Sequence, residues 1–504
     1  MYSAKKKLGQ LEEVHTTESP CTTEGAVHKA ETRLDQHGFP LIPQPSNFND
    51  DPVNWPLWTK WMVLIQVSLL AFLGPFNSSV INPAFIVLAK HFSISSQEAS
   101  YQTTTAIIAA GIFPIFYTPV ANVYGRRPVY LLATLVGIIA SVCGAIAPAW
   151  SSLLVTRAIA GGATSVAMAL GAATVNDIFF LHERGAKMGV WTVFLQNGPH
   201  IAPLIGGYLI EASGYKWGYY LPAIVNSVLL VIMIVALPET LFSRSERTLR
   251  QHKERTYFQM LFSFRRNCLR DRSLHWRDFI RPFEMLQYPS VALTAIYYMV
   301  QFAYGTVLPA VTIAILFTKI YHFRMGIIGL MMGLPLLIGS FLGEVLSGPF
   351  SDFIMYQYAK RHNGERKPEA RLTASIASAF FTPAGIIIYG VCLHYKTHWI
   401  GPVLGNAVAG FGLQLATTVN YAYCSDCYKP QSGEIGALYN FARQIFSFTV
   451  GFYALPFAES VGVQWAWFTF AMIVFSAFSG IVLLMWKGQS WRERLGQPKF
   501  HEDI

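Results

Sequence analysis

Charged side chains are scarce in this chain. Of its 504 residues, 13% are Asp, Glu, Lys or Arg, whereas 53% are hydrophobic. A soluble globular protein of average composition carries about twice that share of charge. The composition therefore indicates a membrane protein rather than a soluble domain.

Residue patterns of several enzyme classes are also missing. The sequence has no G-x-x-x-x-G-K-[ST] run, which excludes ATP as the energy source, and no intramembrane His cluster, acidic pair or nucleophile constellation. Of six cysteines, only Cys424 and Cys427 are close in sequence. A zinc site would need a second ligand pair, and a redox motif would need a soluble strand and helix around it. We therefore expect no cofactor, no metal site and no enzymatic activity.

Long hydrophobic runs are what the chain has in abundance. Twelve apolar stretches, each about 20 residues long as a membrane-spanning helix requires, fall into two sets of six around a basic loop. The predicted spans are 60–82, 101–122, 128–147, 152–178, 187–211, 218–237, 290–317, 326–350, 372–393, 398–423, 434–458 and 463–486. This pattern predicts an all-α membrane protein with twelve transmembrane helices in two pseudo-symmetric six-helix bundles.

Composition divides the chain into five expected segments. They are a disordered cytoplasmic tail at 1–58, an N-terminal bundle at 59–240, a basic cytoplasmic loop at 241–289, a C-terminal bundle at 290–487 and a cytoplasmic tail at 488–504. The first tail mixes Lys, Glu, Thr and Pro with few large apolar residues, so it cannot bury enough surface to fold. No cleavable signal precedes the first span, which would itself act as the insertion signal.

The basic residues are sorted between alternate loops. One set of loops carries 21 Lys and Arg residues, eleven of them between Arg244 and Arg281, and the other set carries five. Because positive loops remain cytoplasmic, both termini are expected in the cytosol, with the plasma membrane as the location. The net charge of +10 is this bias, so no nucleic-acid partner is expected. The expected partners are a small-molecule substrate, protons and the lipid bilayer, with the chain itself monomeric.

A sharp turn joins the second and third spans. It has the sequence Thr118-Pro-Val-Ala-Asn122-Val-Tyr-Gly125-Arg126-Arg127-Pro, where Gly supplies permissive dihedrals and the Arg pair faces the headgroups. This run resembles the major facilitator signature G-x-L-S-D-R-x-G-R-R, with Thr118, Asn122 and Val123 departing from it. The corresponding place after the eighth span, Gly348-Pro-Phe-Ser-Asp352, keeps the Gly and the Asp and indicates internal duplication. The resemblance implies a gating role for Gly125, Arg126, Arg127 and Asp352.

The fifth span contains Asn197-Gly-Pro199-His200-Ile-Ala-Pro-Leu-Ile-Gly206-Gly207. It resembles the G-x-x-x-G-P-x-x-G-G motif of proton-linked antiporters in the same superfamily, where the motif is associated with export. Shorter strings at 51–56, 237–240 and 367–372 are similar to a fungal-type drug:proton antiporter branch. That branch includes exporters of drugs and secondary metabolites and importers of organic cations. The alternative for the fifth span is an ordinary kinked packing helix.

Ionisable residues at membrane depth are functional candidates because their burial is expensive. Arg157 resembles the family's fourth-span Arg, which is implicated in proton coupling; the alternative is an Arg that snorkels to the interface. Arg443 lies about 13 Å into the eleventh span at 1.5 Å per residue. It either contacts substrate or has a structural role, in which it ties its helix to a carbonyl or to a carboxylate such as Glu344 or Asp352.

Polar faces on four spans converge on one expected cavity. The predicted substrate-binding residues are Gln66, Asn77, Tyr297, Gln301, Tyr304, Gln414, Tyr439, Asn440 and Arg443. For each amide or hydroxyl, the alternative is an interhelical hydrogen bond. An aromatic and amide lining suits a moderately lipophilic organic molecule. Tyrosine rings can hold an amine, whereas Arg443 favours a neutral or weakly acidic compound.

These expectations together describe a secondary active transporter. It exports a small organic compound by proton antiport with alternating access, and His200, Glu344 and Asp177 are the candidate proton carriers. Two alternatives remain open at this point: a proton-coupled importer of an amine or nutrient, and a non-transporting membrane sensor.

Overall fold

The structure is a computed structural model that describes residues 33, 41, 43–242, 244, 256–262, 274–362, 367–428, 431–496 and 498. All its helices lie in one compact unit that begins at Pro45. In the first half they are η1 (Pro52–Asn54), α2 (Leu57–Ser79), η2 (Asn82–Ala84), α3 (Phe85–Phe92), α4 (Ser96–Tyr124), α5 (Arg126–Ala145), α6 (Trp150–Thr164), α7 (Val166–Ile178), α8 (Leu181–Ser213) and α9 (Trp217–Ala236). The described residues contain no strand, so the predicted all-α fold is confirmed.

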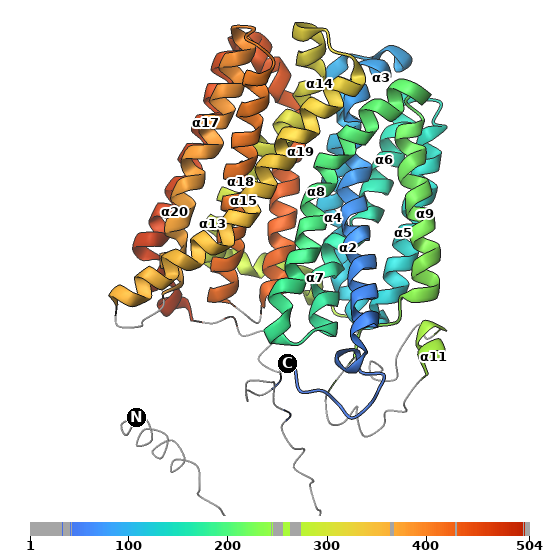
Figure 1. Ribbon diagram of the computed structural model, residues 1–504, viewed down its shortest axis with the longest axis vertical. Coiled ribbons are helices and arrows are strands. Elements are labelled where there is room, and N and C mark those ends of the chain that lie inside the picture. The colour runs from blue at the N-terminus through green and yellow to red at the C-terminus, as the bar shows by residue number, and fades with distance from the viewer. Residues whose placement is uncertain are drawn as a thin grey trace, which may run out of the picture. The chain divides into compact units, whose positions relative to one another are not determined.

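The second half repeats this arrangement after two short helices. Its helices are α11 (Tyr257–Phe262), α12 (Arg277–Glu284), η4 (Met285–Gln287), α13 (Pro289–Phe302), η5 (Ala303–Val307), α14 (Leu308–Tyr321), α15 (Met325–Arg361), α16 (Pro368–Arg371), η6 (Leu372–Ala374), α17 (Ser375–His394), α18 (Ile400–Cys427), α19 (Ser432–Val461) and α20 (Val463–Leu495). In Figure 1 the helices of the first half, blue to green, lie on one side of those of the second half, yellow to red.

Ten helical segments are long and apolar enough to cross a membrane. Two more, α8 with 33 residues and α19 with 30, have the length but a more polar composition. These two helices pack against helices of the opposite half, α8 on α15 and α19 on α4. Polar side chains are tolerated at such depth where they face protein rather than lipid. With these two included, each of the twelve predicted spans corresponds to one helical segment.

The segment boundaries differ from the sequence prediction at both ends. Residues 45–58 already have defined structure: η1 is capped by Asp51 and α2 begins at Leu57, so the expected disordered tail does not extend to residue 58. The last helix continues to Leu495, beyond the expected end of the bundle at residue 487. Residues 1–32 and most of the basic stretch between Arg244 and Arg281 lie outside the described residues.

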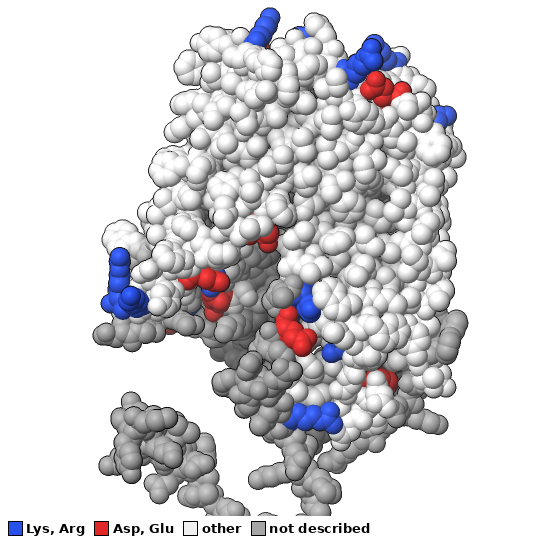
Figure 2. All heavy atoms as spheres, in the orientation of Figure 1, with Lys and Arg blue, Asp and Glu red and all other residues white. Residues whose placement is uncertain are grey.

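The two halves meet closely at one end of the bundle. A Cβ added at Gly329 of α15 would lie 2.2 Å from the carbonyl oxygen of Pro203 on α8, and one at Gly207 would lie 2.7 Å from that of Met325. Glu211 of α8 accepts a hydrogen bond of 2.7 Å from the backbone N–H of Gly326. The two lobes in Figure 2 join in the upper part of the view and separate in the lower part. We call these the closed end and the open end.

A broad band without charged side chains crosses the face of the molecule shown in Figure 2. Lys, Arg, Asp and Glu side chains appear there near the upper end and in the lower part, and the region between is free of them apart from the cleft between the lobes. Exposed apolar side chains on the long helices α5, α9 and α15 include Leu132, Ile139, Val231, Val235 and Phe341. A hydrocarbon layer, which cannot hydrate charge, requires such a band.

Candidate transport site

A cavity lies between the two halves near the middle of the bundle. Its empty space is about 850 Å³, including the solvent at its mouth. The first half contributes residues of α2, η2, α4, α6, α7 and α8, and the second half contributes residues of α13, η5, α14, α15 and α19. Small residues such as Gly74, Ser78 and Gly161 leave the space open, and Met332 and Leu336 give it an apolar wall. A site shared by both halves is the place where alternating access acts.

Arg443 brings a positive charge to this cavity. Its side chain is buried, with 6% of the residue exposed. Its Nε and Nη2 donate to Oδ1 of Asn440 at 3.2 and 3.1 Å, and Nη1 donates to the Tyr298 hydroxyl at 3.3 Å. The guanidinium also lies over the Phe302 ring, 4.5 Å from its centroid. The alternative in which Arg443 ties its helix to Glu344 or Asp352 is not what the structure contains, because neither carboxylate contacts it.

His200 and Asn82 are further polar residues of the cavity wall. His200 of α8 is 5% exposed, and its Nε2 lies 3.4 Å from the hydroxyl of Ser340 on α15. Asn82 is fully buried and accepts a 2.7 Å hydrogen bond from Thr103. Asn82 could have been found from the sequence by its place just before Pro83 in a break of the first span, since irregular backbone at membrane depth lines cavities.

Of the nine predicted substrate-binding residues, only Arg443 lines this cavity. In the seventh span, Tyr297 bonds with Ser378 of α17 and accepts from Gln301, and Tyr304 bonds with Tyr453 of α19. These side chains therefore bond with one another inside the C-terminal bundle, although Oε1 of Gln301 has no partner among the described residues. The cavity instead receives Phe302 and Thr306, on either side of the start of the π-helical segment η5.

The remaining predicted residues also have partners within the protein. Gln66 donates to the carbonyl oxygens of Met62 and Ala236, and Gln414 donates to Glu344. Tyr439 bonds with Thr294 and Cys424. Asn440 donates across the halves to the carbonyl oxygen of Ala110. These amides and hydroxyls therefore fit the alternative prediction, in which they form hydrogen bonds within the protein, better than the prediction that they line the cavity.

Arg157 lies in the interior of the N-terminal bundle. It is 1% exposed and donates to the backbone oxygens of Asn77 and Ser78 at 3.0 and 3.1 Å, and to the side chain of Asn77 at 3.4 Å. Its guanidinium lies 5.6 Å from the Tyr219 ring centroid. A snorkelling conformation is therefore not observed. Arg157 fixes the end of α2, whose Ser78 and Ser79 line the cavity.

Glu344 occupies the middle of α15. Its carboxylate accepts hydrogen bonds from Gln414 and, at 3.1 Å, from Thr418, both on α18. Gln414 in turn lies 3.5 Å from Gln196 of α8 in the other half. Among the described ion pairs none involves Glu344. This acid therefore sits at the junction of the halves with neutral partners.

At the open end, the turn after α4 is held by two carboxylates. Gly125 has a φ of 104°, which only Gly adopts without strain. Arg126 pairs with Asp177 at the end of α7, and the backbone N–H groups of Arg126 and Arg127 donate to Glu239 at 2.9 and 3.1 Å. Acids at a helix N-terminus are favourable because of the helix dipole. Asp177 is thus engaged away from the cavity.

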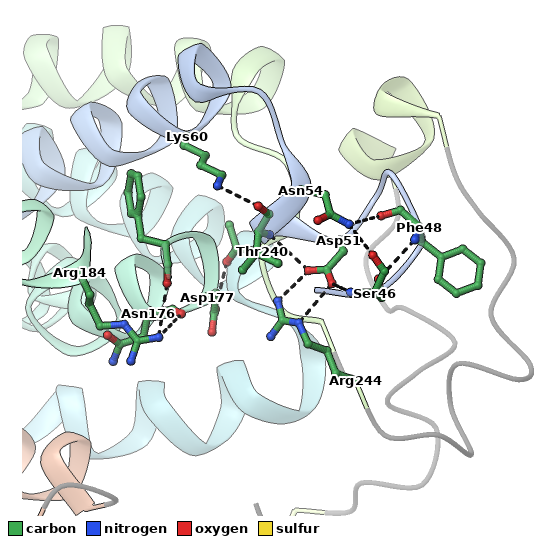
Figure 3. A network of polar contacts seen from close by, with 12 residues as sticks. Ser46, Phe48, Asp51, Asn54, Lys60, Asn176, Asp177, Arg184, Thr240 and Arg244 are labelled. Atoms are coloured by element: carbon green, nitrogen blue, oxygen red, sulfur yellow. Dashed lines mark hydrogen bonds and ion pairs between the residues drawn. The ribbon is translucent and has the colours of Figure 1, made fainter. Parts of the chain in front are cut away.

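A neighbouring network fastens the segment before α2. Asp51 pairs with Arg244, with Oδ1 2.7 Å from Nη2, and accepts from the backbone N–H groups of Ser46 and Val53. Figure 3 shows Arg244 pointing at Asp51, with Thr240 beside Asp177. Although burial raises it, the pKa of Asp51 is held below its ordinary value by the hydrogen bonds and charge of Arg244 and by the hydrogen bonds from Ser46.

The second half contains a counterpart that the sequence prediction missed. Arg371 at the start of the ninth span pairs with Asp426 at the end of α18 at 3.1 Å and with Asp352 at 3.3 Å. Glu369 pairs with Arg492 of α20 at 3.2 Å. Asp426 thus occupies the place of Asp177. Asp426 could have been predicted from the internal duplication, because the end of the fourth span corresponds to the end of the tenth.

The fifth-span motif acts through close contact. Pro199 and His200 line the cavity. Gly206 approaches α2, with an added Cβ 1.9 Å from the Val80 carbonyl oxygen, and Gly207 faces α15. Asn197 donates to Val193 of its own helix at 2.7 Å.

Comparison with known proteins agrees with this architecture. The family model of the Major Facilitator Superfamily matches residues 67–452. The chain belongs to the major facilitator superfamily. It is accordingly an integral multi-pass membrane protein and a carrier of small molecules.

Named relatives of this superfamily member cover most of its length. It is 27% identical over 488 residues to the efflux pump radE of Floropilus chiversii, covering 95% of this chain and 89% of the relative. It is 28% identical to the probable drug/proton antiporter YHK8 of Saccharomyces cerevisiae, covering 77% and 75%. Among solved structures, a bacterial homologue of the human lysosomal transporter Spinster, in an inward-facing and unoccupied conformation, superposes with a TM-score of 0.64 and 12% identity over 87% of this chain and 99% of that one. That likeness concerns the fold alone.

Proposed function

We propose that this protein is a secondary active transporter that exports a small, moderately lipophilic organic compound by proton antiport. The observation that carries the proposal is the central cavity, built from both halves and bounded by a closed end and an open end. Named relatives that are an efflux pump and a probable drug/proton antiporter support the direction and the coupling. We also propose that the open end and both termini face the cytosol, which the excess of Lys and Arg in one set of loops supports, and that the protein lies in the plasma membrane.

The cavity and the contact between the halves share residues. Asn440 accepts from Arg443 at the cavity and donates to Ala110 on α4 in the other half. A substrate that draws Arg443 away therefore removes the two bonds that hold Oδ1 of Asn440, and so releases the amide whose Nδ2 group donates from α19 to α4. Such a contact, made in one conformation and broken in the other, links occupancy to rocking of the halves.

Glu344 and His200 remain as proton carriers, whereas Asp177 is engaged by Arg126 at the open end. Glu344 accepts only from neutral side chains and is near the junction of the halves. Protonation of Glu344 would weaken the acceptor that Gln414 and Thr418 use, which frees α18 to move against α15.

Cellular accumulation tests the proposal. Cells that express the protein, loaded with a neutral dye (Nile red) and an acidic dye (fluorescein), should lose at least one dye faster than cells carrying an empty vector. A protonophore should abolish the difference. Arg443→Ala should remove it with expression unchanged. Faster accumulation would instead indicate the importer alternative, and a response to the dyes without any flux would indicate the sensor alternative.

A further inference from the structure

The charge of the cavity wall has a single sign. Among the lining residues, all of which the structure describes, Arg443 alone is fully charged, and neither Asp nor Glu is present. The rest of the wall is apolar, hydroxyl or amide, apart from His200. The cavity thus offers a ligand one permanent positive charge and no negative one.

Arg443 is not fully satisfied by its neighbours. A guanidinium has five N–H groups, and the bonds to Asn440 and Tyr298 use three of them. No carboxylate of the described residues lies within ion-pair distance of Arg443. Burial of a cation without a counter-ion at membrane depth is costly, so a bound anion would stabilise this arrangement.

Arg157 provides an internal comparison. It is also buried and also donates three hydrogen bonds, to Asn77 and Ser78, and its Nε has no partner among the described residues. Unlike Arg443, it does not line the cavity. Arg157 therefore serves the packing of its own bundle. Arg443 instead belongs to the cavity wall, where a ligand has room.

A second unfilled donor lies in the same wall. Thr103 accepts from Gln102 at 3.1 Å and donates to Oδ1 of Asn82 at 2.7 Å. Because Thr103 uses its only hydrogen to donate to Asn82, the Asn82 atom that it contacts is the amide oxygen, and the Nδ2 group lies on the other side of the amide. The buried Nδ2 atom has no partner among the described residues. Donors without acceptors match a ligand with more acceptor atoms than donors.

We propose that the substrate is an amphipathic organic anion whose carboxylate, sulfonate or similar group pairs with Arg443. Its apolar body would lie against Phe302, Met332 and Leu336 on the wall of the same cavity. Guanidinium and a planar or tetrahedral oxyanion form charge-assisted, often bidentate hydrogen bonds. The inference rests on the proposed transport function and names the substrate class of that site.

A matched pair of probes tests the charge requirement. The purified full-length protein in detergent would be titrated by calorimetry with 2-naphthalenesulfonate and with 2-naphthalenesulfonamide, which share the ring and differ in charge. The sulfonate should bind at least about tenfold more tightly, a factor that corresponds to about 1.4 kcal/mol. Equal affinities, or no binding of either probe, would overturn the proposal without any variant being made.

Variants then locate the effect. Arg443→Gln should bring the sulfonate down to the affinity of the sulfonamide, and Arg443→Lys should keep part of the preference as a point charge. Arg324→Gln removes one positive charge from an exposed position in an outer loop and should leave the preference unchanged. The preference should persist in 0.5 M salt, since buried pairs are poorly screened. A preference that survives in folded Arg443→Gln, or that salt abolishes, contradicts the assignment.

The two proposals fail separately. Sulfonate binding that depends on Arg443, with no flux of any probe across vesicles, would overturn the transport function and leave the anion site intact. Flux of neutral compounds alone, with no preference for the sulfonate, would overturn the anion site and leave the transport function intact.

Discussion

Two ion pairs at the open end, one in each half, differ in burial. In the first half, Arg126 and Asp177 have side chains that are 7% and 20% exposed; in the second, Arg371 and Asp352 are 17% and 72% exposed. Arg371 also keeps Asp426 as a partner. The cost of losing an acid should follow this difference, because water replaces a partner at an exposed site and cannot do so at a buried one.

Asp177→Asn should therefore destabilise the protein far more than Asp352→Asn. We expect about 3 kcal/mol for the first, since it leaves a buried Arg126 unpaired, and less than about 1 kcal/mol for the second. Thermal unfolding of the purified variants, followed by size-exclusion chromatography, provides the measurement. Equal losses at both positions would contradict the burial argument.

The bonds that Asp51 makes to Arg244, Ser46 and Val53 should depend on the charge of Asp51. Since the folded-state pKa of Asp51 is lowered, its contribution to stability is complete above the ordinary value of 3.8 and is lost as pH falls through the lowered pKa. Asp51→Asn should imitate that loss at neutral pH, by about 1 kcal/mol as for a lost helix cap. Hydrogen exchange at the Ser46 and Val53 amides should accelerate about fivefold, and Arg244→Gln should reproduce part of the effect. Unchanged exchange in both variants would show that the bonds of Asp51 do not hold the segment before α2.

Residue types in the site were easier to predict than their directions. Arg443 was identified because a charge that deep has few structural explanations. Tyr297 and Tyr304 were placed at the cavity by helical spacing, yet they bond inside their own bundle. Both faces of a transporter helix carry polar groups at this depth, so periodicity alone cannot tell the cavity side from the bundle side.

At the level of elements, α8 and α15 are brought together by small residues. Gly207 and Gly329 let their backbones approach at the closed end, as small residues do between membrane helices. The same helix α15 carries Gly348 near its other end, where an added Cβ would meet nothing within 4 Å. This pair of glycines separates the effect of close contact from that of helix propensity.

Gly329→Ala should open the closed end, whereas Gly348→Ala should not. Overpacking of about 1–3 kcal/mol would shift the balance of conformations by a factor of about five or more. Spin labels at Ala212 and Arg324, both exposed near the closed end, would report the distance between the halves. A distribution unchanged by Gly329→Ala, or changed equally by both variants, would show that the contact does not set the conformation.

The seventh span is not one regular helix. Residues 303–307 form a π-helical turn between α13 and α14. A π turn changes the register of the side chains that follow it and is frequent at functional sites. The face predicted from 3.6-residue spacing is therefore not continuous across residues 303–307. The sequence of these residues contains no signal that predicts a π turn.

For the molecule as a whole, the open end should face the cytosol. Leu195 lines the cavity, and Lys216 lies in a loop of the opposite side. In a cysteine-free background, Leu195→Cys should react with a membrane-impermeant maleimide from the cytosolic side and Lys216→Cys from the outer side only. Labelling of both from one side would overturn the topology.

The number of spans, their pairing into two halves, the family resemblance and the deep charge at Arg443 can all be predicted from the sequence alone. These follow from hydropathy, loop charge and local motifs, all of which act along the chain. Only the three-dimensional arrangement of the helices shows which polar side chains face the cavity, which acid pairs with each arginine and which end is closed. Those outcomes depend on the rotation and contact of helices far apart in sequence, as between Gly207 and Met325 or between Arg371 and Asp426, and no local pattern encodes them.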